Sequence, residues 1–201
     1  MRDDHYAPGT VTALLETDRM TAATRQVLRV RLDQNPSAGP RFFDSTTFEL
    51  LRCVSARLIP QSDPGRFIDL AGRLDVQLLE GVGKGWRYDS LPPDDNLLTI
   101  GLQGIDETAA IMFGQGFNTL SESQQTSVLT AVQNGAAPGG TWQQLPAHLF
   151  FEELLAALVA LYYAHPWSQE AIGVVAMADK QGWQRIGLNQ LEMIEPLALN
   201  K

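Results

Sequence analysis

The most apolar stretch of the chain runs from Leu145 to Pro166 and predicts a central helix. Its apolar positions cover more than one helical face, which is typical of a helix that is packed on several sides. Pro166 ends the pattern, because proline lacks an N–H and disfavours helix at the residue before it. Glu152 and Glu153 lie inside the stretch, and the uncharged run after them is far shorter than the roughly 20 residues that a bilayer requires. We therefore expect a core helix and no membrane span.

Helical periodicity also marks the segments that precede this stretch. Residues 10–33 hold two short helical patterns, the second with Val27, Leu28 and Leu32 on its apolar side. A strong helix start follows at 44–49, where Thr46 and Glu49 fit a capping box and Asp44 or Ser45 are alternative caps. Further helices are predicted over about 66–80, from Asp94 or Asp95 to 114–116, and from Ser121 to Asn134, with polar or Pro/Gly loops between them.

Two glycines inside a predicted helix carry a packing prediction. Gly101 and Gly104 each cost about 1 kcal/mol relative to alanine. Their spacing of three favours close contact with a neighbouring element, a kink being the alternative. No segment shows sustained alternation, and Val174-Val175 form a short strand at most.

These patterns predict an all-α fold: an irregular bundle of about six or seven helices with an irregular Gly/Trp-containing C-terminal tail. We expect an N-terminal arm with short helices over 1–41 and a single helical domain over 42–201.

Composition excludes several classes of protein. The chain has 201 residues, 44% hydrophobic and 19% charged, with a formal net charge of −8. An acidic chain without a basic patch is not expected to bind nucleic acid. Cys53 is the single cysteine, so no intramolecular disulfide or cysteine metal cluster is predicted, and a small buried hydrophobe is its first interpretation.

Catalytic motifs are not apparent in the sequence. His5, His148 and His165 are far apart, and neither helical histidine has the spacing of a metal pair, so we interpret both as core or cap residues. The glycines of 81–85 lack the spacing of a phosphate loop. We therefore predict no catalytic, cofactor-binding or metal-binding residue in this chain.

Tryptophan is the remaining signal. Trp86, Trp142, Trp167 and Trp183 all fall in loops or at helix ends. Such residues either close the ends of a bundle or contact another protein. For Trp142 we favour bundle closure, and for the other three the two interpretations weigh equally.

The order and spacing of several stretches resemble those of the gluconate 2-dehydrogenase subunit 3 family. Its members are the small (gamma) subunits of bacterial FAD-dependent sugar dehydrogenases. The matching stretches are 48–60, 68–75, 101–106 with Gly116-Phe117, 150–154, 161–166, Glu170 to Gly173 and 182–187.

The resemblance implies a non-catalytic subunit that binds and stabilises a large glucose-methanol-choline type flavoprotein, which holds the FAD and oxidises a sugar or polyol. A cytochrome c subunit often takes the electrons. The family often carries a twin-arginine leader, which these residues lack, so we expect a cytoplasmic chain, or a periplasmic one if a leader was removed or lies on the partner. The predicted partner interface consists of Trp86, Tyr88, Tyr162, Tyr163, His165, Trp167, Ile172 and Trp183.

Two alternatives stay open. In the first alternative the chain is an enzyme with a site in the bundle, but the sequence shows no cluster of polar groups that would form such a site. In the second it is a stand-alone small-ligand-binding or scaffold protein. An apolar cavity near Trp167 and Trp183 would favour the ligand-binding alternative.

Overall fold

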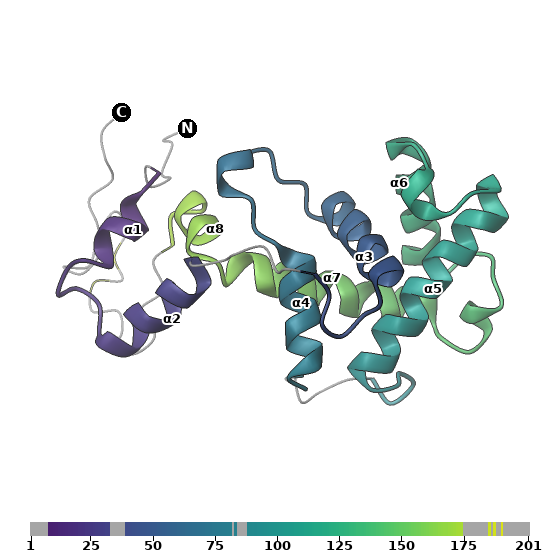
Figure 1. Ribbon diagram of the computed structural model, residues 1–201, viewed down its shortest axis with the longest axis horizontal. Coiled ribbons are helices and arrows are strands. Elements are labelled where there is room, and N and C mark those ends of the chain that lie inside the picture. The colour runs from purple at the N-terminus through teal and green to yellow at the C-terminus, as the bar shows by residue number, and fades with distance from the viewer. Residues whose placement is uncertain are drawn as a thin grey trace. The chain divides into compact units, whose positions relative to one another are not determined.

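The computed structural model describes residues 8–32, 39–81, 83, 88–174, 185, 187 and 190, and within them the fold is all-α as predicted. Figure 1 shows the arrangement of the helices. The α-helices are α1 (Thr10–Leu14), α2 (Ala22–Leu32), α3 (Ser45–Leu58), α4 (Leu70–Leu79), α5 (Asp94–Phe113), α6 (Glu122–Gln133), α7 (Ala147–Tyr163) and α8 (Pro166–Ala171). Three short 3-10 helices join them: η1 (Pro64–Arg66), η2 (Phe117–Thr119) and η3 (Thr141–Gln143).

The chain divides into two compact units. One unit spans 36–161, and the other combines 1–35 with 162–201. Local packing accounts for this grouping: α8, which follows the central helix, contacts α1 and α2 and so joins the N-terminal helices.

The unit 36–161 is built around α5, which packs against α3, α6 and η3. Figure 1 shows α3 to α6 gathered with most of α7 in this unit. The predicted apolar positions of α3, α5 and α7 form its interior, and the most deeply buried include Leu51, Val54, Leu102, Ile105, Phe150, Leu154 and Leu158. Burial of each such side chain is worth about 1.5–3 kcal/mol, so these helices form the stable centre of the unit.

The two glycines of α5 make the close contacts predicted for them. A Cβ at Gly101 would lie 2.0 Å from the Phe150 ring of α7, and one at Gly104 would lie 2.6 Å from Trp142. Trp142 Nε1 also donates a hydrogen bond to Thr108 Oγ1 at 2.7 Å. Trp142 therefore closes the bundle, as the sequence suggested.

Most helix boundaries follow local sequence signals. Asp44, one of the alternative caps, accepts a hydrogen bond from Thr47 N–H at 2.9 Å and begins α3. Ser121 and Gln124 form the predicted capping box of α6. Gly114 has a φ of 73° at the end of α5, a conformation that suits glycine.

The predicted helix over 66–80 is wrong at its start. Gln61 binds both backbone groups of Ile68 through its side-chain amide, at 2.8 and 2.9 Å, and Asp69 caps α4 through Gly72 N–H. These contacts delay the start of the helix to Leu70 and leave Phe67, an apolar residue of the predicted helix, 52% exposed. In the same way Val27 is 47% exposed, because the neighbouring Leu28 takes the buried position of α2.

The other unit has a small core of Leu14, Leu15, Met20 and Leu28, with Leu32 packed against it. A buried carboxylate ties its two segments together. Glu170 of α8 is 1% exposed and accepts hydrogen bonds from Gly9 N–H at 2.9 Å and Val11 N–H at 2.7 Å. Glu170 thereby satisfies backbone donors at the start of α1, which an isolated helix leaves unpaired.

Candidate functional site

Four of the predicted interface residues, Tyr162, Tyr163, His165 and Trp167, lie in or beside the turn between α7 and α8. Ile172 follows the end of α8. Tyr88 belongs to the unit 36–161. Trp86 and Trp183 fall outside the described residues.

The α7–α8 turn is fixed by side chains that bind its backbone carbonyls. The Ser168 hydroxyl donates to the carbonyls of Tyr162 and His165, and Gln169 Nε2 donates to Tyr163 O at 3.0 Å. From α2, Arg31 Nη1 donates to Ala164 O at 2.9 Å. These bonds satisfy carbonyls at the end of α7, where the intrahelical donors run out.

His165 is a buried residue of this turn. Its side chain is 0% exposed, and its Nδ1 accepts a hydrogen bond from Trp167 N–H at 3.2 Å, capping α8. Its ring lies 4.7 Å from the Trp167 ring, centroid to centroid. The interpretation of His165 as a cap residue is confirmed, and within this structure its side chain has no exposed surface to offer a partner.

Large side chains are exposed before and after the buried His165 in the chain. Tyr163 is 44% exposed, Ile172 47% and Val174 45%. The Tyr162 and Tyr163 rings meet edge to face at 5.1 Å, which limits the freedom of the exposed ring. This region therefore exposes hydrophobic and aromatic side chains beside a turn whose carbonyls are hydrogen-bonded.

Tyr88 is half-exposed on the unit 36–161. Its hydroxyl donates to Glu152 Oε2 at 3.3 Å. The negative charge of Glu152, followed by burial, raises the pKa of Tyr88 above its ordinary value, so the phenol stays protonated. Glu152, one of the two adjacent glutamates of α7, therefore accepts a hydrogen bond from outside its own helix.

A cavity of about 500 Å³ lies between α3 and the segment that leads into α4. Its lining residues include Glu49, Arg52, Cys53, Ser55 and Ala56 from α3, Gln61 and Phe67 to Ala71 from the following segment, and Asn118 from η2. Periodicity could not indicate this cavity, because one wall is the non-helical backbone that Gln61 holds in place. Trp167, near which an apolar cavity would have favoured the ligand-binding alternative, is not among these lining residues.

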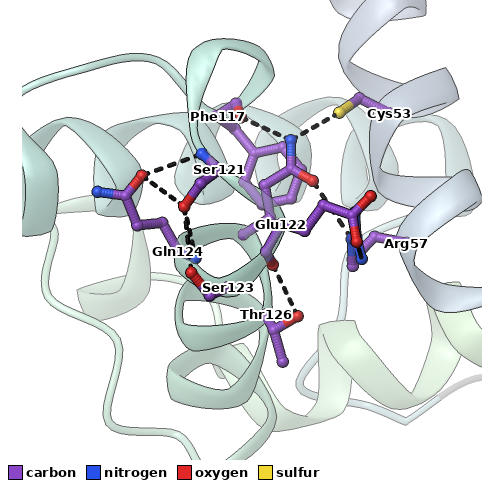
Figure 2. Close-up of polar contacts among 9 residues, drawn as sticks. Cys53, Arg57, Phe117, Ser121, Glu122, Ser123, Gln124 and Thr126 are labelled. Carbon is purple, nitrogen blue, oxygen red and sulfur yellow. Dashed lines mark hydrogen bonds and ion pairs between the residues drawn. The ribbon is translucent and has the colours of Figure 1, made fainter.

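Cys53 links the cavity to a polar network, drawn in Figure 2. The buried Gln125 of α6 donates from Nε2 to Cys53 Sγ at 3.1 Å and to Phe117 O at 3.2 Å. Its Oε1 accepts from Arg57 Nε at 3.3 Å, and Arg57 also pairs with Glu122 at 3.0 Å. Burial is the largest influence on Cys53 and raises its pKa, against the opposing effects of Gln125 and Arg57. The thiol is half-buried and protonated, a structural role close to the one expected.

Among the residues that the structure describes, no group of three or more His, Cys, Asp or Glu side chains is placed to hold a metal ion. Within the same residues, no helix has the length and apolar character needed to cross a membrane.

Within the described residues, fold and surface together define an all-α protein with a hydrogen-bonded, partly exposed aromatic turn and a surface cavity beside α3. The gluconate 2-dehydrogenase subunit 3 family model matches residues 45–188, and the chain belongs to that family. The match covers α3 to α8, including the turn and the cavity. No curated protein and no solved structure matches the chain.

Proposed function

We propose that this chain is a non-catalytic accessory subunit that binds and stabilises a FAD-dependent sugar or polyol dehydrogenase. The observation that carries the proposal is membership of the gluconate 2-dehydrogenase subunit 3 family over 45–188. In this proposal the FAD and the oxidation chemistry belong to the large flavoprotein subunit, and a cytochrome c subunit is a further candidate component of the complex.

The surface around the α7–α8 turn supports a binding role. Tyr163 and Ile172, both predicted interface residues, are large apolar side chains that are nearly half exposed. Gln169 holds the carbonyl of Tyr163, and the N–H of Ile172 donates to the carbonyl of Ser168 at 3.2 Å, so little conformational entropy would be lost when a partner covers these two residues. An obligate interface of this kind buries about 2,000 Å² or more, so it would extend beyond the turn.

Co-expression tests the proposal. The chain would be tagged and produced with an untagged glucose-methanol-choline type flavoprotein from the same genome, and with an unrelated flavoprotein as the control. We expect the cognate flavoprotein to co-purify with bound flavin absorbance, and to be more soluble than when produced alone. Haem absorbance in the purified complex would identify a cytochrome partner, and cell fractionation would give the compartment.

A chain that purifies alone, while the flavoprotein is equally soluble and flavin-loaded without it, would contradict the proposal. Dehydrogenase activity in the isolated chain would contradict its non-catalytic part.

A further inference from the structure

The cavity beside α3 has the size of a small-molecule site. Ligand pockets in proteins usually measure about 300–1,000 Å³, and the volume here is about 500 Å³. Its apolar lining residues include Ala56, Ile68, Leu70 and Ala71. Phe67, which is 52% exposed, adds an aromatic side chain. The cavity can therefore pack the apolar body of a ligand beside an aromatic ring.

The charged residues of the lining carry an excess of negative charge. They are two carboxylates and one guanidinium, those of Glu49, Asp69 and Arg52. Arg52 Nη1 pairs with Glu49 Oε1 at 3.1 Å. Asp69 is half-buried, and its Oδ1 accepts a hydrogen bond from Gly72 N–H, an uncharged donor. Among the described residues the charge of Asp69 therefore has no cationic partner.

The surroundings of the cavity favour a positively charged ligand as well. All lining residues belong to the unit 36–161, which carries fourteen acidic and seven basic side chains. Such a surplus attracts cations and repels anions over a distance of about 8–10 Å at physiological salt. The face of an exposed aromatic ring such as that of Phe67 also attracts cations.

We propose that this cavity binds a small organic monocation, in which an ammonium group is attached to an apolar ring. The ammonium group pairs with the carboxylate of Asp69, and the ring packs against Phe67, Ile68 and Ala56. None of these residues belongs to the α7–α8 turn, and the proposal does not rest on the accessory-subunit function.

The experiment is an NMR titration of the full-length, ¹⁵N-labelled chain at pH 7 with three probes that share one ring. The probes are 4-methylbenzylamine, which is protonated at this pH, the neutral 4-methylbenzyl alcohol and the anionic 4-methylbenzoate. We expect saturable shifts at the amides of Ala56, Ile68 and Asn118 with the amine, weaker binding of the alcohol and no saturation with the benzoate. Raising NaCl from about 20 to 300 mM should weaken binding of the amine and leave that of the alcohol unchanged.

Two matched variants test the role of Asp69. Asp69→Asn removes the charge and keeps a side chain that can cap α4. We expect it to weaken amine binding by about 2- to 5-fold, the range of an ion pair at a partly exposed site, and to leave alcohol binding unchanged. Asp63→Asn is the control, because Asp63 caps η1 in the same way, through Gly65 N–H at 2.9 Å, and is not a lining residue. It removes the same charge from the same unit and should leave amine binding close to that of wild type.

Phe67→Ala locates the ring of the ligand. It should weaken binding of the amine and of the alcohol alike, because both probes pack the same ring against Phe67.

The proposal would be overturned by an absence of saturable shifts at the three amides with the amine, or by alcohol binding as tight as that of the amine. Equal losses of amine affinity in Asp69→Asn and Asp63→Asn would also overturn it, since the amine would then respond only to the overall acidity of the unit.

Discussion

At the scale of single residues, acidic side chains hold backbone segments that are distant in sequence. Asp75, 1% exposed, accepts hydrogen bonds from the N–H groups of residues 41–43 at 2.6 to 3.2 Å. Asp106 accepts from Phe117 N–H at 2.8 Å. Glu107 binds the loop before η3 through Gly140 and Thr141 N–H, at 2.8 and 3.0 Å. Carboxylates thus accept hydrogen bonds from backbone N–H groups in loops, which have no helical acceptor. The net charge alone does not show that these acidic side chains have this structural role.

Glu107 gives stability a dependence on pH. The backbone N–H of Thr141, then its side chain and the N–H of Gly140, lower the pKa of Glu107 below its ordinary value of 4.5. A carboxylate with a lowered folded-state pKa stabilises the fold above its unfolded pKa, and this contribution is lost as pH falls through the folded-state pKa. We expect Glu107→Gln to be less stable than wild type at pH 7, with the difference shrinking below about pH 4.5. Urea unfolding at several pH values measures this, and a constant difference would contradict it.

Gly101 sets the approach of α7 to α5. A Cβ there would lie 2.0 Å from the Phe150 ring, and that ring is fully buried. We expect Gly101→Ala to lower the free energy of unfolding by about 1–3 kcal/mol, because overpacking outweighs the gain in helix propensity. Chemical denaturation measures the change. Gln103→Ala, at an exposed position of the same helix, is the control and should be close to neutral.

At the scale of elements, short helices depend on tertiary partners. α1 has five residues and α8 has six, well below the length at which an isolated helix is stable in water. α8 begins at Pro166 with His165 as its cap, so the proline that ends α7 also starts the next helix. The first N–H groups of α1 donate hydrogen bonds to the carboxylate of Glu170, a residue of α8.

Replacement of Glu170 should therefore release α1. Glu170→Gln leaves one acceptor oxygen where two N–H groups need one each, and its amide places donors against donors. We expect faster hydrogen exchange at residues 10–14 and earlier proteolytic cleavage near residue 9, while α5 stays protected. Glu16→Gln, at an exposed position with one surface ion pair, is the control. Unchanged exchange in α1 would show that Glu170 does not hold it.

At the scale of the whole molecule, charge is unevenly distributed between the two units. Residues 36–161 carry fourteen acidic against seven basic side chains, whereas 1–35 with 162–201 carry nine against eight. Almost all of the net charge of −8 therefore belongs to one unit. The exposed aromatic turn belongs to the nearly neutral unit, where long-range repulsion of an acidic partner is weak.

A double substitution tests the turn as an interface. Tyr163→Ser with Ile172→Ser removes two exposed apolar side chains and keeps Arg31, Ser168 and Gln169, whose side chains bind the carbonyls of the turn. We expect at least tenfold weaker association with the flavoprotein, a small salt dependence and a melting temperature close to wild type. Analytical ultracentrifugation at several salt concentrations measures the association and its salt dependence, and thermal unfolding measures the melting temperature. Val27→Ser with Val30→Ser, exposed on α2, is the matched control, and equal losses in the two pairs would argue against a specific interface.

Local signals in the sequence were sufficient for much of the fold. The capping box at Ser121, the stop at Gly114 and the apolar faces of α3, α5 and α7 depend on residues a few positions apart, so their effect can be inferred without tertiary information. The contact of α5 at Gly101 and Gly104 was also predictable, because an interior glycine is tolerated mainly where something approaches closely.

The start of α4, the exposure of Phe67, the cavity and the grouping of α8 with α1 were decided by tertiary structure. Each depends on a side chain that bonds a distant or non-helical backbone, as Gln61 does at Ile68 and Glu170 does at Gly9 and Val11. Such contacts leave no periodic trace in the sequence. The sequence by itself determined an acidic, all-α member of its family with aromatic residues after the central helix. Only the packed chain determined that His165 is a buried cap, that Tyr163 and Ile172 are exposed, and that Cys53 lines a cavity.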